Sequence, residues 1–181
     1  MASLQERVIG AMRLQPSTFE EVEHDQAATS QAAMVVVAVA ISGSLFGLLR
    51  GQVVAAMSAV VLGLVVWALA SFLILLIGTK LLPGKNTEAD LGQLLRTVGF
   101  AQAPALFSVL VSIPLLGLLV WLVLQIWVIV AMVIAVRQAL DYDDTLRAAI
   151  VVLIAWVVGV AITTSFALFG VGAAVLSRVA F

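Results

Sequence analysis

Asp141, Asp143 and Asp144 come closer than any other part of this sequence to a metal-binding pattern. Carboxylate oxygens are the ligands that Ca²⁺ and Mg²⁺ prefer in proteins. A calcium loop also needs a central glycine and a later glutamate, and this segment has neither. Capping of the next helix by Asp143 or Asp144 accounts for the aspartates without a metal. The sequence therefore predicts no metal site and no cofactor.

The single histidine, His24, lies in the charged run Glu23-His24-Asp25. The chain has no cysteine, so a Cys/His zinc site, a disulfide and thiol catalysis are all excluded. The sequence also has no serine-elbow motif, no phosphate-binding loop and no pair of carboxylates within an apolar segment. We therefore expect a protein that is not an enzyme.

Polar residues inside apolar segments are the remaining candidates for a functional site. Arg96 lies near a helix end, where its side chain is expected to reach the interface and anchor the helix, with partner binding as the alternative. Gln102 and Gln125 are expected to form interhelical hydrogen bonds. The alternative is that they line a transport path together with Ser108 and Ser112.

The composition places these residues in a membrane protein. The chain has 181 residues, of which 64% are hydrophobic and 10% charged. A soluble domain has about 45–50% apolar and about 25% charged residues. Lipid must therefore cover much of the apolar surface. The net charge of −1 excludes a basic surface for nucleic acid, and the first apolar run, near residue 32, follows an acidic flank that does not fit a cleavable signal.

The longest apolar stretch, residues 94–136, is predicted to form a helical hairpin. A helix rises about 1.5 Å per residue and a bilayer core is about 30 Å thick, so this stretch is long enough to cross twice. The turn is expected at Ile113-Pro114-Leu115-Leu116-Gly117. Pro104 is expected to kink the first arm, because proline lacks an amide hydrogen and clashes with the preceding turn.

The whole chain is predicted to be an all-α integral membrane protein, a five-span helical bundle with short amphipathic helices at the N-terminus. Residues 1–31 form a cytoplasmic N-terminal segment, and residues 32–181 form the transmembrane domain. The predicted spans are about 32–49, 53–77, 94–113, 118–136 and 145–168, with Gly170 and Gly172 loosening the end of the last.

The N-terminal segment is predicted to contain two short helices. Leu4, Val8 and Ala11 lie on one stripe of residues 2–15, which indicates a helix on the membrane surface; a loose tail is the alternative. Pro16 is expected to end this segment. Ser17 and Glu20 then form a capping-box pattern for a second helix, from Thr18 to about Gln26. In the later loop, Thr87 is expected to cap the third span.

Charge asymmetry predicts the orientation. With the N-terminus in the cytoplasm, seven basic residues lie inside and two, Arg50 and Arg178, lie outside. All ten acidic residues also fall inside. We name the three polar segments 1–31, 78–93 and 137–146 the collar, and expect them to form one surface. Partners are expected to bind there, around Arg13, Glu20, Glu21 and Arg96.

Several short motifs resemble the Yip family (Ypt/Rab-interacting proteins). They are Arg13-x-x-Pro16-x-x-Phe19-Glu20, Leu95-Arg96-x-x-Gly99-Phe100-Ala101-x-Ala103-Pro104, Ile113-Pro114-Leu115-Leu116-Gly117, Trp127 and Arg137. The resemblance covers nearly the whole chain and is greatest to the bacterial branch. It implies a five-span core with a cytoplasmic N-terminus, in the bacterial inner membrane, with structural roles for Pro16, Gly99, Pro104 and Pro114.

Eukaryotic members of that family are implicated in vesicle traffic and in binding prenylated small GTPases. The N-terminal segment here, residues 1–31, is shorter than theirs and lacks their proline-bearing acidic region. The expected function is therefore a multi-pass membrane scaffold or accessory subunit, in membrane organisation or trafficking-like roles. Its expected partners are lipid, other membrane proteins or further copies of itself, and a cytoplasmic protein. The alternative is a small oligomeric transporter or channel with a path along the 94–136 hairpin.

Overall fold

The computed structural model describes residues 2–85 and 87–179, and within them the chain is helical without a strand. Its helices are α1 Leu4–Met12, α2 Pro16–His24, α3 Ala28–Leu49, α4 Val53–Leu76, the π-helix η1 Ile77–Leu81, α5 Leu91–Ala101, the 3₁₀-helix η2 Ala103–Ser112, α6 Gly117–Ala139 and α7 Thr145–Val179. Five helical segments are long and apolar enough to cross a membrane, which confirms the predicted fold class.

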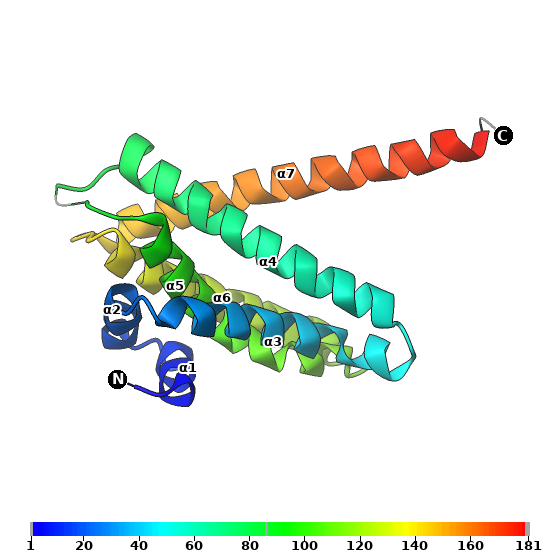
Figure 1. Ribbon diagram of the computed structural model, residues 1–181, viewed down its shortest axis with the longest axis horizontal. Helices are drawn as coiled ribbons and strands as arrows, with labels where there is room; N and C mark the ends of the chain where they lie inside the picture. Colours follow the sequence, from blue (N-terminus) through cyan, green and yellow to red (C-terminus); the bar gives the residue numbers. More distant parts are fainter. Residues whose placement is uncertain (1, 86, 180–181) are drawn as a thin grey trace.

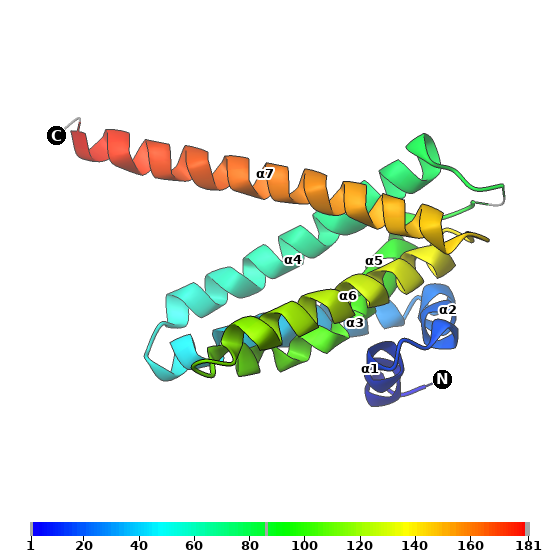
Figure 2. The same cartoon turned by 180° about the vertical axis from the view of Figure 1, so that it is seen from behind.

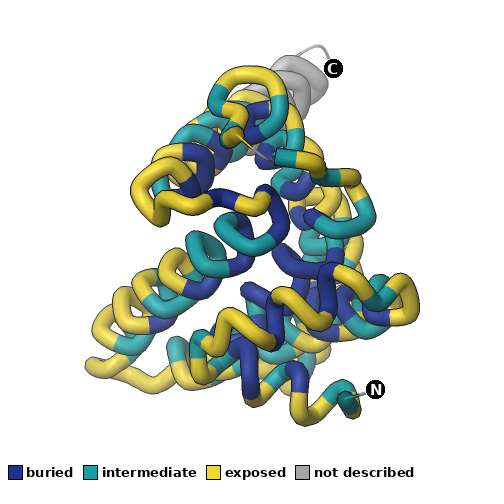
Figure 3. Tube along the Cα trace, turned by 90° about the vertical axis from the view of Figure 1, so that its left-hand side faces the viewer, coloured by how far each residue is buried: buried dark blue, intermediate teal, exposed yellow. Residues whose placement is uncertain are grey.

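The long helices run roughly along the long axis of the molecule (Figures 1 and 2). The short helices α1 and α2 lie at one end, with the η1–α5 loop and the α6–α7 loop. The α3–α4 turn and the C-terminal end of α7 lie at the other end. Helix α5 contacts α3, α4 and α6, and α7 contacts α4 and α6. In Figure 3 the buried positions face the centre of the molecule and the exposed ones face outward.

The helices differ from the predicted spans at several ends. The second continues through η1 to Leu81 instead of ending near residue 77, the third begins at Leu91 instead of residue 94, and the fourth ends at Ala139 instead of residue 136. The first span begins at Ala28 instead of residue 32. The last was predicted to end near residue 168, but α7 continues to Val179 without a break at Gly170 or Gly172. A glycine costs a helix interior only about 1 kcal/mol. In lipid, an unpaired backbone group costs more, so the helix is the favoured backbone for this segment.

Pro104 breaks the third span and does not merely kink it. Helix α5 ends before this residue, and the chain continues to the turn as the 3₁₀-helix η2. Proline supplies no amide hydrogen and clashes with the carbonyl four residues earlier, so the α-helical pattern cannot continue. The hydroxyl of Ser42 on α3 holds the new segment, since it donates to the carbonyl of Leu106 (2.7 Å) and accepts from the amide of Val109 (3.2 Å).

Helices α3 and α5 approach closely at Gly99. A Cβ atom added there would lie 2.7 Å from the Cβ of Ala32 and 3.1 Å from Nε1 of Trp67. The indole of Trp67 in turn donates to the carbonyl of Leu95 (3.0 Å), which ties α4 to α5. Only glycine fits this crossing without a shift of the neighbours.

The N-terminal residues fold into two helices, so the alternative of a loose tail is wrong. Ser3 and Glu6 form a capping box at the start of α1. The capping box predicted at Ser17 and Glu20 is absent from α2, because that helix begins at Pro16 and Ser17 therefore lies inside it. Proline suits the first position of a helix, where no amide donor is needed.

The cap predicted for the third span is also wrong. Asp90 caps α5 and forms a capping box with Gln93. The hydroxyl of Thr87 instead donates to the carbonyl of Leu140 (3.0 Å), in the loop that follows α6. The last span agrees with the prediction, since Asp144 accepts a hydrogen bond from the amide of Leu146 (2.9 Å) in the first turn of α7.

Candidate partner-binding collar

The three segments of the collar meet at one end of the bundle. Figures 1 and 2 show α1, α2, the η1–α5 loop and the α6–α7 loop at this end of the molecule. The apolar faces of the two N-terminal helices are covered by protein. Helix α1 contacts α2, α5 and η2, and α2 contacts α5 and α6. Phe19 and Val22 are fully buried in these contacts. The collar is therefore built into the fold.

Arg96 fastens α2 to α5. Its side chain is only 6% exposed, so it does not extend to the interface as expected. Its Nε donates to the carbonyls of Val22 and Glu23 (both 3.0 Å), and its Nη2 donates to the Glu23 carbonyl as well. These carbonyls belong to the last turn of α2 and lack partners within the helix. A cation is favoured at that end of the helix by the dipole.

Arg7 is a second buried arginine, which the sequence analysis did not single out. Its side chain is 1% exposed, and Nη2 forms ion pairs with Glu21 (2.8 Å) and Asp25 (2.6 Å). Nη1 donates to the side chain of Gln31 on α3 (2.9 Å). The Arg7 guanidinium lowers the pKa of both carboxyl groups. The signal was present, because Arg7 lies between Leu4, Val8 and Ala11 on the same helical face.

Two further hydrogen bonds attach the N-terminal helices to α6. The indole of Trp127 donates to the carbonyl of Met12 (2.9 Å), and its ring stacks on Phe107 of η2 with centroids 6.2 Å apart. The amide of Gln138 donates to the carboxylate of Glu20 (2.9 Å). The position of α1 and α2 is thus set by contacts with α3, α5 and α6.

Glu23 is a buried carboxyl group at the centre of the collar. It is 3% exposed and accepts a hydrogen bond from Gln93 (3.1 Å). Burial raises the pKa of Glu23 to about 7, with smaller increases from Asp141 and Glu20 that His24 and Arg96 oppose. At neutral pH this group is close to the midpoint of its titration.

The raised pKa of Glu23 makes the stability of the collar depend on pH. The folded state favours the protonated form of Glu23. The stability that this group contributes is therefore fully present below pH 4.5 and is lost as pH rises through 7. We expect Glu23→Gln to remove this loss and to stabilise the protein at pH 8 by up to about 3 kcal/mol. Thermal unfolding of both proteins in detergent at pH 4.5 and pH 8 measures this difference in stability. The slope left in the variant comes from the other shifted groups: His24, whose pKa is raised first by its hydrogen bond to Glu20, and Glu21 and Asp25, whose pKa values Arg7 lowers. Equal wild-type and variant stabilities at both pH values would contradict the expectation.

The two loops of the collar are joined through Tyr142. Its hydroxyl donates to the carbonyls of Gly78 (3.0 Å) and Leu82 (2.7 Å). Arg147 lies over the ring, 5.8 Å from its centroid, and donates to the carbonyl of Pro83 (2.8 Å). The Gly78 carbonyl belongs to the π-helix η1, and the Tyr142 hydroxyl supplies it with a hydrogen-bond donor.

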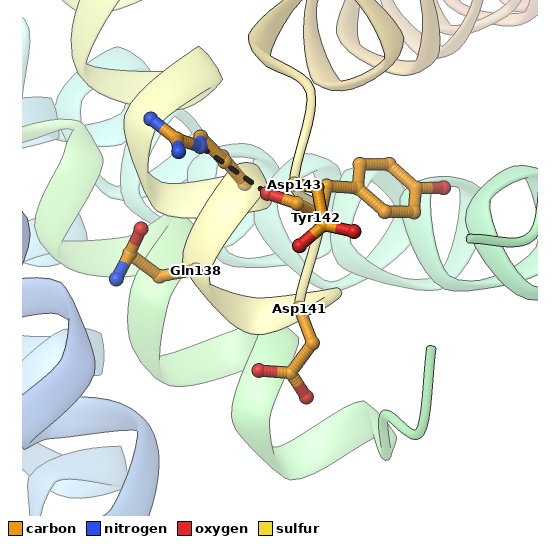
Figure 4. A pocket seen from close by; sticks show the side chains of 5 residues that line it. Gln138, Asp141, Tyr142 and Asp143 are labelled. Carbon is orange, nitrogen blue, oxygen red and sulfur yellow. Dashed lines mark hydrogen bonds between the residues drawn. The ribbon is translucent and has the colours of Figure 1, made fainter. Parts of the chain in front are cut away.

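A cavity of about 330 Å³ opens beside this junction, lined by Arg137, Gln138, Asp141, Tyr142 and Asp143 (Figure 4). The part of the chain that the structure describes has no group of three or more His, Asp or Glu side chains placed to hold a metal ion. Asp144 caps α7, and the ring of His24 is bonded to the carbonyl of Glu20.

The predicted partner-binding residues separate into two groups. Arg13, at the C-terminal end of α1, and Glu20 and Glu21 on α2 are exposed, although Glu20 and Glu21 already accept hydrogen bonds from Gln138 and Arg7. Arg96 is buried beneath them. Its side chain can position α2 but cannot reach a partner bound to the surface. Arg7, absent from the predicted set, has the same positioning role.

The polar residues proposed for a transport path lie apart from the cavity. Gln102 ends α5, and Gln125 is half-buried on α6. Ser112 is exposed near the turn at the far end of the bundle. The Ser108 hydroxyl is buried beside Gly43 and has no hydrogen-bond partner among the described residues. These positions leave the transport hypothesis a prediction.

A protein-family model described as the Yip1 domain matches residues 9–166. The match extends from α1 into α7 and includes the collar from residue 9 onward and parts of all five apolar helical segments. Comparison with curated proteins and with solved structures finds no match.

Proposed function

The chain belongs to the Yip1 domain family, and we propose that it is a non-enzymatic membrane scaffold or accessory subunit whose collar binds a cytoplasmic protein. The observation that carries this proposal is the pair of buried arginines, Arg7 and Arg96, which hold α1 and α2 in one position on the bundle. A surface that is fixed before binding loses little conformational entropy when a partner docks.

The chemistry of the two ends of the molecule supports this assignment. The collar presents exposed Arg13, Glu20 and Glu21 on a helical scaffold. The opposite end presents short turns at Arg50-Gly51-Gln52 and Pro114–Gly117, with few polar side chains. Specific binding of a soluble protein needs polar groups in a defined arrangement, and the collar supplies more of both.

The bacterial inner membrane and a cytoplasmic N-terminus are part of the same proposal. Six of the nine basic residues belong to the collar segments or to the first turn of α7, and a seventh, Arg96 on α5, is bonded to α2 at the same end. The excess of basic residues favours the cytoplasmic side for these segments. The exposed apolar side chains of the spans, such as Val54 and Met57 on α4, face lipid or another membrane protein.

Site-specific photocrosslinking in intact membranes tests the proposal. A photoreactive residue at position 13, exposed directly after α1, is expected to give a protein adduct of defined mass. Matched probes at Arg50, on the opposite end, and Met57, on the lipid-facing side of α4, are expected not to give that adduct. The same adduct from Met57 and none from position 13 would place the contact within the membrane and refute collar binding.

A further inference from the structure

The cavity beside the end of α6 combines opposite charges that are not paired with one another. Its lining residues include one cation, Arg137, and two carboxylates, Asp141 and Asp143 (Figure 4). Among the described residues, both ion pairs are made by Arg7. The opposite charges of the cavity are therefore available to a ligand that carries both signs.

Arg137 keeps most of its donors free. Its Nε donates to the carbonyl of Tyr142 (3.2 Å), which fixes the guanidinium against the loop. An arginine has five donors, and a pair of them matches the geometry of a phosphate. The second side of the cavity also has a free acceptor. Gln138 uses its amide nitrogen to donate to Glu20, and its carbonyl oxygen remains able to accept a hydrogen bond.

The position of Arg137 relative to the membrane indicates the source of the phosphate. Ile126 and Val130 are exposed on α6, and Arg137 follows them on the same helical face at the collar end. Acyl chains covering this face would bring their headgroup to the level of Arg137. Asp141 and Asp143 belong to the loop after the helix, so in a bilayer crossed by α6 we expect them further from its centre than Arg137.

From this order we propose that the cavity binds the headgroup of an aminoalkyl phospholipid, of the phosphatidylethanolamine class. The phosphate binds Arg137, and the primary ammonium group binds Asp141, Asp143 and the carbonyl oxygen of Gln138. In such a lipid the phosphate lies next to the acyl chains and the ammonium group lies toward water, which is the same order as Arg137 and the two aspartates. The ring of Tyr142 is held away by its bonds to Gly78 and Leu82, so it leaves room for the headgroup.

The test is equilibrium binding of short-chain fluorescent lipids to the full chain in detergent. We expect wild type to bind phosphatidylethanolamine about tenfold more tightly than phosphatidylcholine, whose quaternary ammonium cannot donate hydrogen bonds. Combined Asp141→Asn and Asp143→Asn should abolish this preference, and asparagine tolerates the positive φ of Asp141. Arg137→Gln should weaken binding of both lipids, because both carry the phosphate.

Matched controls are Lys80→Gln and Glu88→Gln, exposed charges of the collar that do not line the cavity. Neither should change lipid binding.

Soluble glycerophosphoethanolamine should compete only weakly if the acyl chains contribute, and full competition would show that the site takes the headgroup from solution. Equal wild-type affinity for both lipids, or a preference that survives the two asparagine substitutions in a variant with unchanged thermal stability, would overturn the proposal. Arg137→Lys, which keeps the charge, should bind more tightly than Arg137→Gln, and identical binding by the two would also overturn it.

Discussion

Replacing Arg96 by leucine is expected to release α2 from the end of the bundle. The substitution leaves the carbonyls of Val22 and Glu23 without the charged donor that they share in the native protein. Loss of such hydrogen bonds at a buried site costs about 3 kcal/mol. Hydrogen exchange in detergent should show faster exchange over residues 16–24, with the spans α3 and α6 little changed.

The control for this result is Arg13→Leu, which removes an exposed arginine from the turn between α1 and α2. It should leave the exchange of α2 at the wild-type rate. Arg96→Lys keeps the charge but offers a single donor group, so an intermediate effect is expected. Unchanged protection of α2 in Arg96→Leu would show that apolar packing alone holds the helix in place.

Arg7→Met is expected to detach α1 from α2 and α3. The change removes a buried guanidinium and leaves Glu21, Asp25 and Gln31 without their shared partner. Breaking a buried pair costs about 3–5 kcal/mol, and the partial exposure of Glu21 reduces the expected cost to about 2–3 kcal/mol. Limited proteolysis between α1 and α2, at residues 13–15, measures the detachment.

The pH dependence separates ionic from packing effects in the Arg7 variant. Arg7 lowers the pKa of Glu21 and Asp25, so the wild-type protein gains stability from them above pH 4.5 and loses it as pH falls further. Arg7→Met should lack this acid-linked loss and approach the wild-type cleavage rate in strong acid. A variant that remains more sensitive by the same factor at every pH would indicate that lost packing, not charge, explains the effect.

The spans could be predicted from the sequence because their length and apolar composition are local properties. A run such as Val53–Leu76 has few alternatives in lipid. The details at helix ends were less predictable, since two capping patterns compete within a few residues. Ser17 and Thr87 both had suitable side chains, but Pro16 and Asp90 set the actual starts of the helices.

The collar could be predicted as a set of segments but not as a structure. Arg96 was assigned to the interface because its sequence position, near a helix end, suits snorkelling. Its real partners are backbone carbonyls of α2, more than seventy residues earlier in the chain, and no side-chain pattern reveals carbonyl acceptors. The cavity was hidden for a similar reason. It joins Arg137 to Asp141 and to Asp143, and of these two aspartates Asp143 was a candidate for the cap of the last span.

The central claim is that the collar segments lie together on the cytoplasmic side of the membrane. Because the chain has no cysteine, single-cysteine variants at Arg13, Glu88, Asp143 and Gly51 can be labelled with a membrane-impermeant maleimide in sealed vesicles of known orientation. We expect positions 13, 88 and 143 to react only from the cytoplasmic side and position 51 only from the other side. Reaction of any two collar positions from opposite sides, or of position 51 from the cytoplasmic side, would contradict it.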